Sequence, residues 1–322
     1  MSCLTRFVLA AAVAMLASAA AAQTYPTRPI RLMVSFPPGG AADVVARLVG
    51  QPLSARLGQP VVVENRPGSN GNLAAELAAR AAPDGYTLLL GPSALFGINP
   101  HLYGRMSIDP LKELLPVASL VSNDLILAAN PTLAAGRDLR GFIALARASS
   151  PPLFYGSIGK GSEHHLAMEF LRQQAGIELV HVPYRGGGPA AIGVMAGDVA
   201  AMFGGGSVAP LVQSGKLAGL AVSGARRSAA LPDVPAIAEV YPGYEVTLWQ
   251  GLFAPHGTPD AVVERLRAET AAALAQRDFA EKLAAAGSGE PYVTTPAEFV
   301  ARIRADHEKY GRLIKSIGAT LD

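Results

Sequence analysis

Short apolar segments alternate with segments of helical pattern along most of the chain. This rhythm predicts an α/β fold, in which parallel strands carry helices on both faces of a sheet. Because such crossovers are right-handed, the turns that leave the strands should lie along one edge of the sheet. In the first part of the chain the predicted strands are 30–36, 61–64 and 86–91; one predicted helix is 72–81, and another begins near Ala41 and is interrupted at Gly50 and Pro52.

A second unit of the same kind begins near Leu125. No Pro-, Gly- or Ser-rich tether separates the two units, and segments 121–125 and 244–252 have the pattern of strands. We therefore expect two domains, 23–124 plus 246–322 and 125–245, joined by two crossings that form a hinge. The predicted strands of the second unit are 125–129, 153–157, 179–184, 199–203 and 217–223, its main helices are 138–148 and 162–174, and the C-terminal helices are 259–277, 278–286 and 296–317, with a short strand near 291–294.

The N-terminus has the pattern of a secretory signal peptide. Arg6 precedes an apolar run over 7–22 that ends in small residues before Gln23. This run is shorter than the roughly 20 residues that span a bilayer, so a cleaved signal over residues 1–22 is favoured over a membrane anchor. Cleavage would remove Cys3, the only cysteine. The mature chain would then have no disulfide and no cysteine that could bind a metal.

Charge and hydropathy exclude several classes of partner. The formal net charge is +2, and no run of lysine or arginine stands out. Nucleic acid and anionic membrane surfaces are therefore not expected partners. No second long apolar segment follows the first, so we expect the mature chain not to be inserted in a membrane.

The first turn, residues 35–43, joins the first predicted strand to a helix and contains Phe36, Pro38, Gly39, Gly40 and Asp43. The two glycines allow a ligand to approach the backbone closely. The N–H groups that begin a helix lack partners within the helix, and they attract anions together with the helix dipole. Asp43 could cap these donors or bind a polar group of a ligand. A purely structural strand-to-helix turn explains the pattern equally well.

The second turn, residues 155–165, again joins a strand to a helix and contains Ser157, Gly161, Ser162 and His165. Ser162 is the expected N-cap of that helix. The turn resembles a phosphate loop, but Phe154 stands where a Walker A motif requires glycine. Nucleotide binding is therefore not supported, and we expect no cofactor.

Two more glycine-rich turns follow strands. The third turn, residues 183–189, contains Tyr184, Arg185 and Gly186; Arg185 offers a fork that fits a carboxylate, although it could equally be a solvated surface residue. The fourth turn, residues 203–209, contains Gly204 and matches a dinucleotide motif only in part, since no acidic residue lies about 20 residues further on.

Motifs for catalysis or metal binding are scarce. The neighbours His164 and His165 would point about 100° apart on a helix and have no HExxH spacing, so we expect no metal site. No GxSxG motif occurs, and the spacing of Ser, His and Asp indicates no triad. Several glycine-bearing turns with few acid or base groups favour binding over turnover.

A series of motifs in fixed order resembles one family, the tripartite tricarboxylate transporter receptors, or Bug-type solute-binding proteins. The resemblance covers essentially the whole mature chain. The motifs are YPTRPI at 25–30, FPPGG at 36–40 with Asp43, GQPVVVENRPG at 58–68, APDGYTL at 82–88, INP at 98–100, Gly161-Ser162 with His165-Leu166, HVPY at 181–184, LPDVP at 231–235 and AP-GTP at 254–259.

The resemblance implies a periplasmic, non-catalytic receptor with the type II binding-protein fold: two α/β domains, mixed and mostly parallel sheets, and a ligand cleft between the domains. It implies a carboxylate ligand held by the first turn and by Gly161-Ser162. Ser93 and the Tyr184-Arg185-Gly186 segment would complete the wall. The implied partners are the permease subunits of a tripartite tricarboxylate transporter.

Three positions depart from the family pattern. Family members often have aspartate where this chain has Gly204 and Ala200, and lysine where it has Arg185. The missing acid at position 204 indicates a different contact for the far end of the ligand. Two alternatives stay open: a ligand-loaded sensor that docks on a membrane kinase, and a hydrolase or isomerase that uses Asp43, His165 and Tyr184 as acid and base groups.

Overall fold

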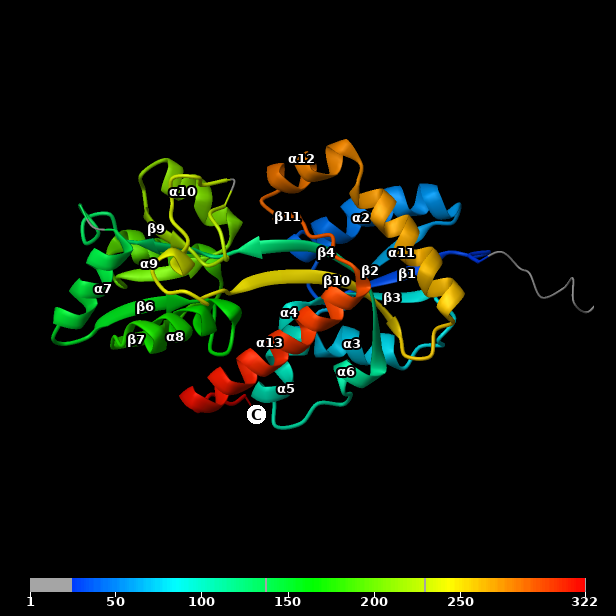
Figure 1. Cartoon of the computed structure of the whole chain (residues 1–322), viewed down its shortest axis with the longest axis horizontal. Helices are drawn as coiled ribbons and strands as arrows, with labels where there is room; N and C mark the ends of the chain where they lie inside the picture. The colour runs from blue at the N-terminus through cyan, green and yellow to red at the C-terminus, as the bar shows by residue number, and fades with distance from the viewer. Residues whose placement is uncertain (1–24, 137, 229, 322) are drawn as a thin grey trace, which may run out of the picture.

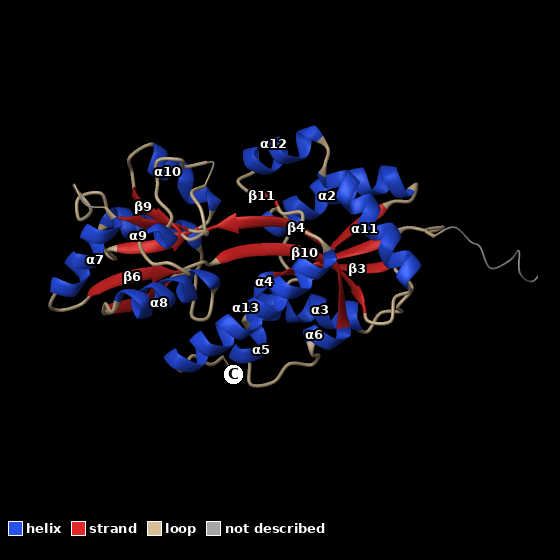
Figure 2. Ribbon diagram, in the orientation of Figure 1, coloured by secondary structure: helices blue, strands red, loops and turns tan. Residues whose placement is uncertain are grey.

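The computed structural model describes residues 25–136, 138–228 and 230–321; the expected signal peptide lies outside them. Two β-sheets, each with helices on both faces, form two domains that lie end to end (Figures 1 and 2). The six-stranded sheet of the first domain has the order β11-β4-β10-β3-β1-β2, and the five-stranded sheet of the second has the order β7-β6-β8-β5-β9. No helix in these described ranges is long and apolar enough to cross a membrane.

The strands of the first sheet are β1 (Ile30–Val34), β2 (Val61–Asn65), β3 (Thr87–Pro92), β4 (Leu114–Asp124), β10 (Thr247–Pro255) and β11 (Glu290–Pro291), and those of the second are β5 (Ile126–Ala129), β6 (Leu153–Ser157), β7 (Leu179–Pro183), β8 (Ala201–Gly204) and β9 (Ala218–Val222). Both sheets are mixed, as the family resemblance implies, but they are not mostly parallel: among the described strands four pairs are parallel and five are antiparallel. Strands β2-β1-β3 and β7-β6-β8 are parallel. The strands nearest the crossings, β4, β10 and β5, pair antiparallel.

The α-helices of the first domain are α2 (Ala41–Leu57), α3 (Asn72–Ala79), α4 (Ser93–Gly97), α5 (Asn99–Leu102), α6 (Pro110–Glu113), α11 (Asp260–Leu274), α12 (Arg277–Ala285) and α13 (Pro296–Ile317), and those of the second are α7 (Leu139–Ala148), α8 (Glu163–Ala175), α9 (Gly187–Ala196) and α10 (Ala209–Gln213). Short 3₁₀ turns are η1 (Ser69–Gly71), η2 (Gly206–Val208) and η3 (Ile237–Glu239). The chain enters the second sheet between Asp124 and Ile126 and returns before Thr247 (Figure 1).

Helix α2 corrects one prediction from the sequence. It continues past Gly50 and Pro52 without interruption. Proline removes one helical hydrogen bond, but the face around it, including Val45, Val49 and Leu53, is fully buried against the first sheet. The burial of this face offsets the missing bond, because each large aliphatic side chain contributes about 1.5–3 kcal/mol.

One apolar cluster is shared by both domains. On the side of the first domain it contains Leu102 of α5 and Tyr310 and Leu313 of α13. These side chains pack in the same cluster as Phe142 and Leu166 of the second domain. Figure 1 shows α13 reaching from the first domain toward the second. The two domains are therefore joined by core packing on this side as well as by the two crossing strands.

Candidate functional site

The carboxyl ends of the parallel strands in the two sheets meet each other. Strand β3 ends at the start of α4, where the Ser93 hydroxyl donates a 3.0 Å hydrogen bond to the carboxylate of Glu163. Glu163 opens α8, which follows β6. A Cβ added at Gly161 would overlap Leu102 of the first domain. Since parallel strands share one edge for their carboxyl ends, the four glycine-rich turns follow the strands on these edges, and the second and fourth turns contact the first domain through Gly161 and Gly206.

The first turn presents an uncapped helix start. Gly40 is the N-cap residue of α2 and makes no side-chain cap. Gly39 has φ +82°, a left-handed conformation that favours glycine, and a Cβ added there would meet nothing within 4 Å. The N–H groups of Ala41, Ala42 and Asp43 have no partner inside the helix. The turn therefore offers backbone donors at the positive end of a 17-residue helix.

Asp43 is bonded within its own domain. Its carboxylate accepts from Arg47 Nη2 at 2.9 Å and Arg47 Nε at 3.0 Å, from the Gly39 N–H at 3.0 Å and from the Asn65 amide at 3.0 Å. The hydrogen bond from Arg47, opposed by partial burial and helped by Gly39 and Asn65, lowers the pKa of Asp43 to about 2. Asn65 also donates to Phe36 O at 3.0 Å. Asp43 thus closes the turn and stays ionised at neutral pH.

Residues that the sequence did not single out hold the first turn in place. These residues are Arg47 and Asn65, which bond to Asp43. Gly71 lies against the turn, since a Cβ added there would lie 3.2 Å from Ser35 and 3.7 Å from Pro92. The Ser35 hydroxyl is buried and has no hydrogen-bond partner within the described residues. Asn65 ends β2 beside the end of β1, so the predicted parallel pairing could have pointed to it.

The second turn is hydrogen-bonded to residues of its own domain. The Ser162 side chain caps α8 by accepting from the His165 N–H, which confirms the predicted N-cap. Gly159 and Gly161 have φ +133° and +79°. The ring of His165 is buried, and its Nδ1 accepts from the Gly161 N–H at 3.2 Å. Burial and the nearby His181 lower the pKa of His165 to about 4. Ser157 is fully buried.

The third turn also begins a helix without a side-chain cap. Gly186, with φ +122°, is the N-cap residue of α9. The Tyr184 ring packs on its own domain, next to Gly156 and Gly193. Arg185 is exposed. Neither Arg185 nor the exposed Lys160 of the second turn forms an ion pair with any residue that the structure describes.

A scan against family models matches residues 45–319 to the tripartite tricarboxylate transporter family receptor. The chain belongs to this receptor family. It is 38% identical over 288 residues to the "UPF0065 protein in tcbD-tcbE intergenic region" of Pseudomonas sp. (strain P51), covering 86% of this chain and 84% of that protein. It is 34% identical over 316 residues to Protein BugT of Bordetella pertussis, covering 96% and 95%.

Solved structures of similar receptors include two that carry dicarboxylates. Rpa4515 of R. palustris with adipate is 32% identical with a TM-score of 0.77, covering 92% of this chain and 100% of that one. MatC of Rhodopseudomonas palustris with bound malate is 30% identical with a TM-score of 0.73, covering 90% and 100%.

In this receptor the acid and base groups of the enzymatic alternative have separate partners. Asp43 bonds to Arg47 and Asn65, His165 to Gly161, and Tyr184 packs on its own domain. No hydrogen bond among the described residues joins any two of the three.

The fourth turn explains how the receptor accommodates glycine at position 204. A Cβ added at Gly204 would overlap Val208 Cγ2. Val208 is buried in the core of the second domain. In the next part of the turn, a Cβ added at Gly206 would lie 2.7 Å from Gly287 O of the first domain. The backbones of Gly206 and Gly287 therefore lie close together across the domain boundary at this turn.

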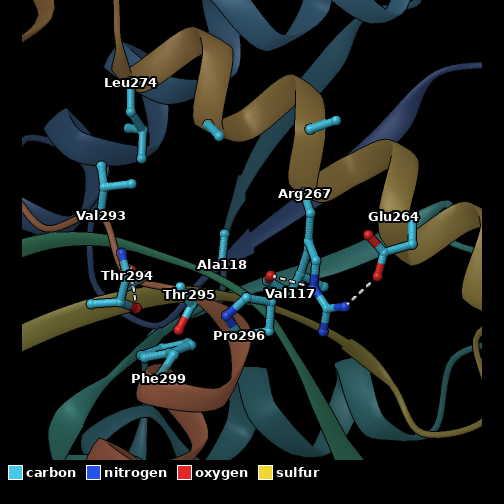
Figure 3. A pocket seen from close by; sticks show the side chains of 13 residues that line it. Val117, Ala118, Glu264, Arg267, Leu274, Val293, Thr294, Thr295, Pro296 and Phe299 are labelled. Atoms are coloured by element: carbon cyan, nitrogen blue, oxygen red, sulfur yellow. Dashed lines mark hydrogen bonds and ion pairs between the residues drawn. The ribbon is translucent and has the colours of Figure 1, made fainter.

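Two further cavities contain none of the predicted site residues. Figure 3 shows one of about 300 Å³ on the first domain, between α11 and the start of α13. Its only cation, Arg267, is already bonded to Val117 O at 3.0 Å and to Glu264 at 2.6 Å. The other, about 750 Å³, lies between the domains beside α10 and α12, and its lining includes Asp124 and Glu290.

Proposed function

We propose that this chain is a periplasmic receptor that captures a small organic carboxylate between its two domains and delivers it to the permease subunits of a tripartite tricarboxylate transporter. Residues 1–22 are taken as a cleaved signal peptide, and the domains as 23–124 plus 246–322 and 125–245. The ligand carboxylate is assigned to the first turn and to the Gly161-Ser162 segment. Ser93 and the Tyr184-Arg185-Gly186 segment are assigned to the wall.

The observation that carries this proposal is a pair of uncapped helix starts on the meeting edges of the two sheets. Gly40 begins α2 and Gly186 begins α9, and neither makes a side-chain cap. Backbone N–H groups at such positions bind anions and favour negative charge by the helix dipole. A Cβ added at Gly186 would meet nothing within 4 Å, so a ligand can approach the backbone there.

The charges around these turns support an anionic ligand. Asp43 is neutralised by Arg47, and Glu163 is bonded to Ser93. The exposed cations Lys160 and Arg185 remain without ion pairs in the described part of the chain. Net positive potential in a cleft raises the local concentration of anions. Two relatives whose structures carry adipate and malate agree with this choice.

A thermal-shift screen tests the proposal. Because a ligand that binds only the folded state stabilises it, an acid at about 100 times its Kd should add about 2.7 kcal/mol to the unfolding free energy. We expect a rise in Tm with one or more members of a panel of mono- and dicarboxylic acids that includes adipate and malate. A rise with sugars or cations and with no acid would refute the proposal.

A matched pair of variants tests the first turn. In Gly40→Phe the added Cβ would meet only Pro37 O, at 3.5 Å, and the residue has φ −79°, so the fold should survive. We expect the ring to block the donors and reduce affinity for the identified acid at least ~30-fold. Gly104→Phe, at an exposed position with nothing within 4 Å, is the control. Retained affinity in Gly40→Phe would show that the first turn does not hold the ligand.

A further inference from the structure

We propose that His165 and His181 are positioning residues that hold the backbone of the second turn in its binding conformation. This inference rests on the proposed function, in which the Gly161-Ser162 segment holds the carboxylate. Both histidines belong to the second domain, and their ring centroids are 4.2 Å apart.

His165 fixes the amide of Gly161. Its Nδ1 accepts the Gly161 N–H at 3.2 Å, so Nδ1 carries no proton and the neutral ring is protonated at Nε2. Nε2 faces Glu169 Oε1 at 4.0 Å. Glu169 is itself held by the Tyr155 hydroxyl at 2.5 Å and by Arg172 at 2.7 Å. The ring therefore lies between the Gly161 N–H, to which it is hydrogen-bonded, and the Glu169 carboxylate, which is beyond hydrogen-bond distance.

His181 fixes Gly159 through Ser157. The Ser157 hydroxyl donates to Gly159 O at 3.1 Å, accepts from Gly159 N–H at 3.0 Å and lies 2.6 Å from His181 Nε2. Because a hydroxyl has one proton, two arrangements satisfy these contacts; in the tautomer with the proton on Nε2, His181 donates to Ser157 and the Ser157 proton goes to Gly159 O. Ser157 then uses its proton and both lone pairs. Tyr155 stacks on the His181 ring at 5.0 Å and limits its movement.

The geometry of the turn makes such support necessary. Gly159 and Gly161 both have positive φ, and glycine at these positions has many alternative conformations to lose on folding. The turn carries Lys160 between them, an exposed residue that adds no packing. One hydrogen bond to the buried His165 ring, and one between Ser157 and the half-buried His181 ring, therefore order the segment before a ligand arrives, which reduces the ordering cost of binding.

Two pairs of variants, with one control, separate positioning from packing. His165→Leu removes the acceptor for Gly161, whereas His165→Asn places an amide oxygen near the position of Nδ1. His181→Leu removes the donor to Ser157, whereas His181→Gln places an amide N–H near the position of Nε2. The control is His164→Leu: His164 is a buried neighbour whose Nδ1 has no hydrogen-bond partner within the described residues.

The first readout is amide hydrogen exchange of Gly159 and Gly161 in the ligand-free full chain at pH 7. We expect His165→Leu to speed exchange at Gly161, and His181→Leu at Gly159, by ~10-fold or more, with recovery in the Asn and Gln variants and no change in His164→Leu. Unchanged exchange in the Leu variants, or Asn and Gln variants that behave like Leu, would overturn the proposal.

The second readout is affinity, measured by calorimetry with adipate and L-malate as probes. A loss of ~10-fold in the Leu variants, with recovery in the Asn and Gln variants, is the expected result. Wild-type affinity in the Leu variants would overturn the positioning role. If neither probe nor any other acid binds the wild-type chain while the exchange result holds, the proposed carboxylate function fails and the support of the turn stands, so the two failures are distinguishable.

Discussion

Replacing Gly161 by alanine should create a steric overlap between the two domains. A Cβ at this position would overlap Leu102 Cδ2 and lie 3.2 Å from Leu102 Cδ1. Leu102 is fully buried in the cluster that both domains share. In addition, φ at Gly161 is +79°, which costs alanine about 1–2 kcal/mol. Overpacking of a buried contact costs about 1–3 kcal/mol. We therefore expect Gly161→Ala to lower the unfolding free energy by about 2–5 kcal/mol.

A double-mutant cycle measured by urea denaturation separates the two costs. Leu102→Ala alone should cost about 2–5 kcal/mol, because it removes a fully buried side chain. In the double variant the overlap is gone, so only the cost of the left-handed backbone should remain on top of the cavity. The coupling energy between the two substitutions should be favourable by about 1–3 kcal/mol.

Gly176→Ala is the matched control. Gly176 has φ +59° as the C-cap of α8, and a Cβ added there would meet nothing within 4 Å. It should therefore show the backbone cost alone, about 1 kcal/mol, with no coupling to Leu102→Ala. If Gly161→Ala and Leu102→Ala add without coupling, or if Gly161→Ala costs no more than Gly176→Ala, the domains do not press on each other at this turn.

Two further predictions concern stability. Burial lowers the pKa of His164 and His165 to about 4 in the folded chain, whereas the pKa of an unfolded histidine is about 6.5. The unfolded chain therefore binds more protons between these pH values. The unfolding free energy should fall as the pH drops from about 6.5 to about 4, by roughly 3 kcal/mol per histidine. Urea titrations across this pH range measure the effect. If the unfolding free energy of His164→Leu falls with acid as much as that of the wild-type chain, the prediction is contradicted. Asp306→Ala should cost about 3–5 kcal/mol, because the buried carboxylate accepts from Trp249 Nε1 at 2.7 Å and pairs with Arg302 and Lys309 at 2.8 Å each. The control Glu308→Ala breaks an exposed ion pair with Arg312, and its unfolding free energy should stay within about 0.5 kcal/mol of the wild-type value. Equal losses of stability in the two variants would refute the stabilising role of the buried Asp306 carboxylate.

Features set by neighbouring residues could be predicted from the sequence. Ser162 was predicted to cap α8, and its side chain does accept from His165 N–H. Helix α13 begins and ends where the pattern placed it, at Pro296 and Ile317. Capping and amphipathic periodicity depend on residues within one or two turns. The order of such local elements also predicted two α/β units, whereas the mixed character of the sheets was implied by the family resemblance.

Contacts between distant residues could not be predicted in this way. Asn65 bonds to Asp43 across 22 positions, and Ser93 to Glu163 across 70. The error at Pro52 has the same origin, since the face of α2 is buried against residues far along the chain. Intrinsic propensity is a weak guide where tertiary burial is this complete.

The polar side chains near the turns are engaged in hydrogen bonds within the protein, whereas backbone N–H groups of the turns remain available to a ligand. The Asp43 carboxylate accepts hydrogen bonds from Gly39, Arg47 and Asn65. The Glu163 carboxylate accepts one from Ser93, across the domain boundary. What is left for an anion is backbone N–H groups and exposed cations, neither of which selects one carboxylate from another. Under the proposed function, such a receptor would hold many acids with the same rigid turns. Selectivity would then come from shape, above all at the fourth turn, where Val208 occupies the space that a side chain on Gly204 would need.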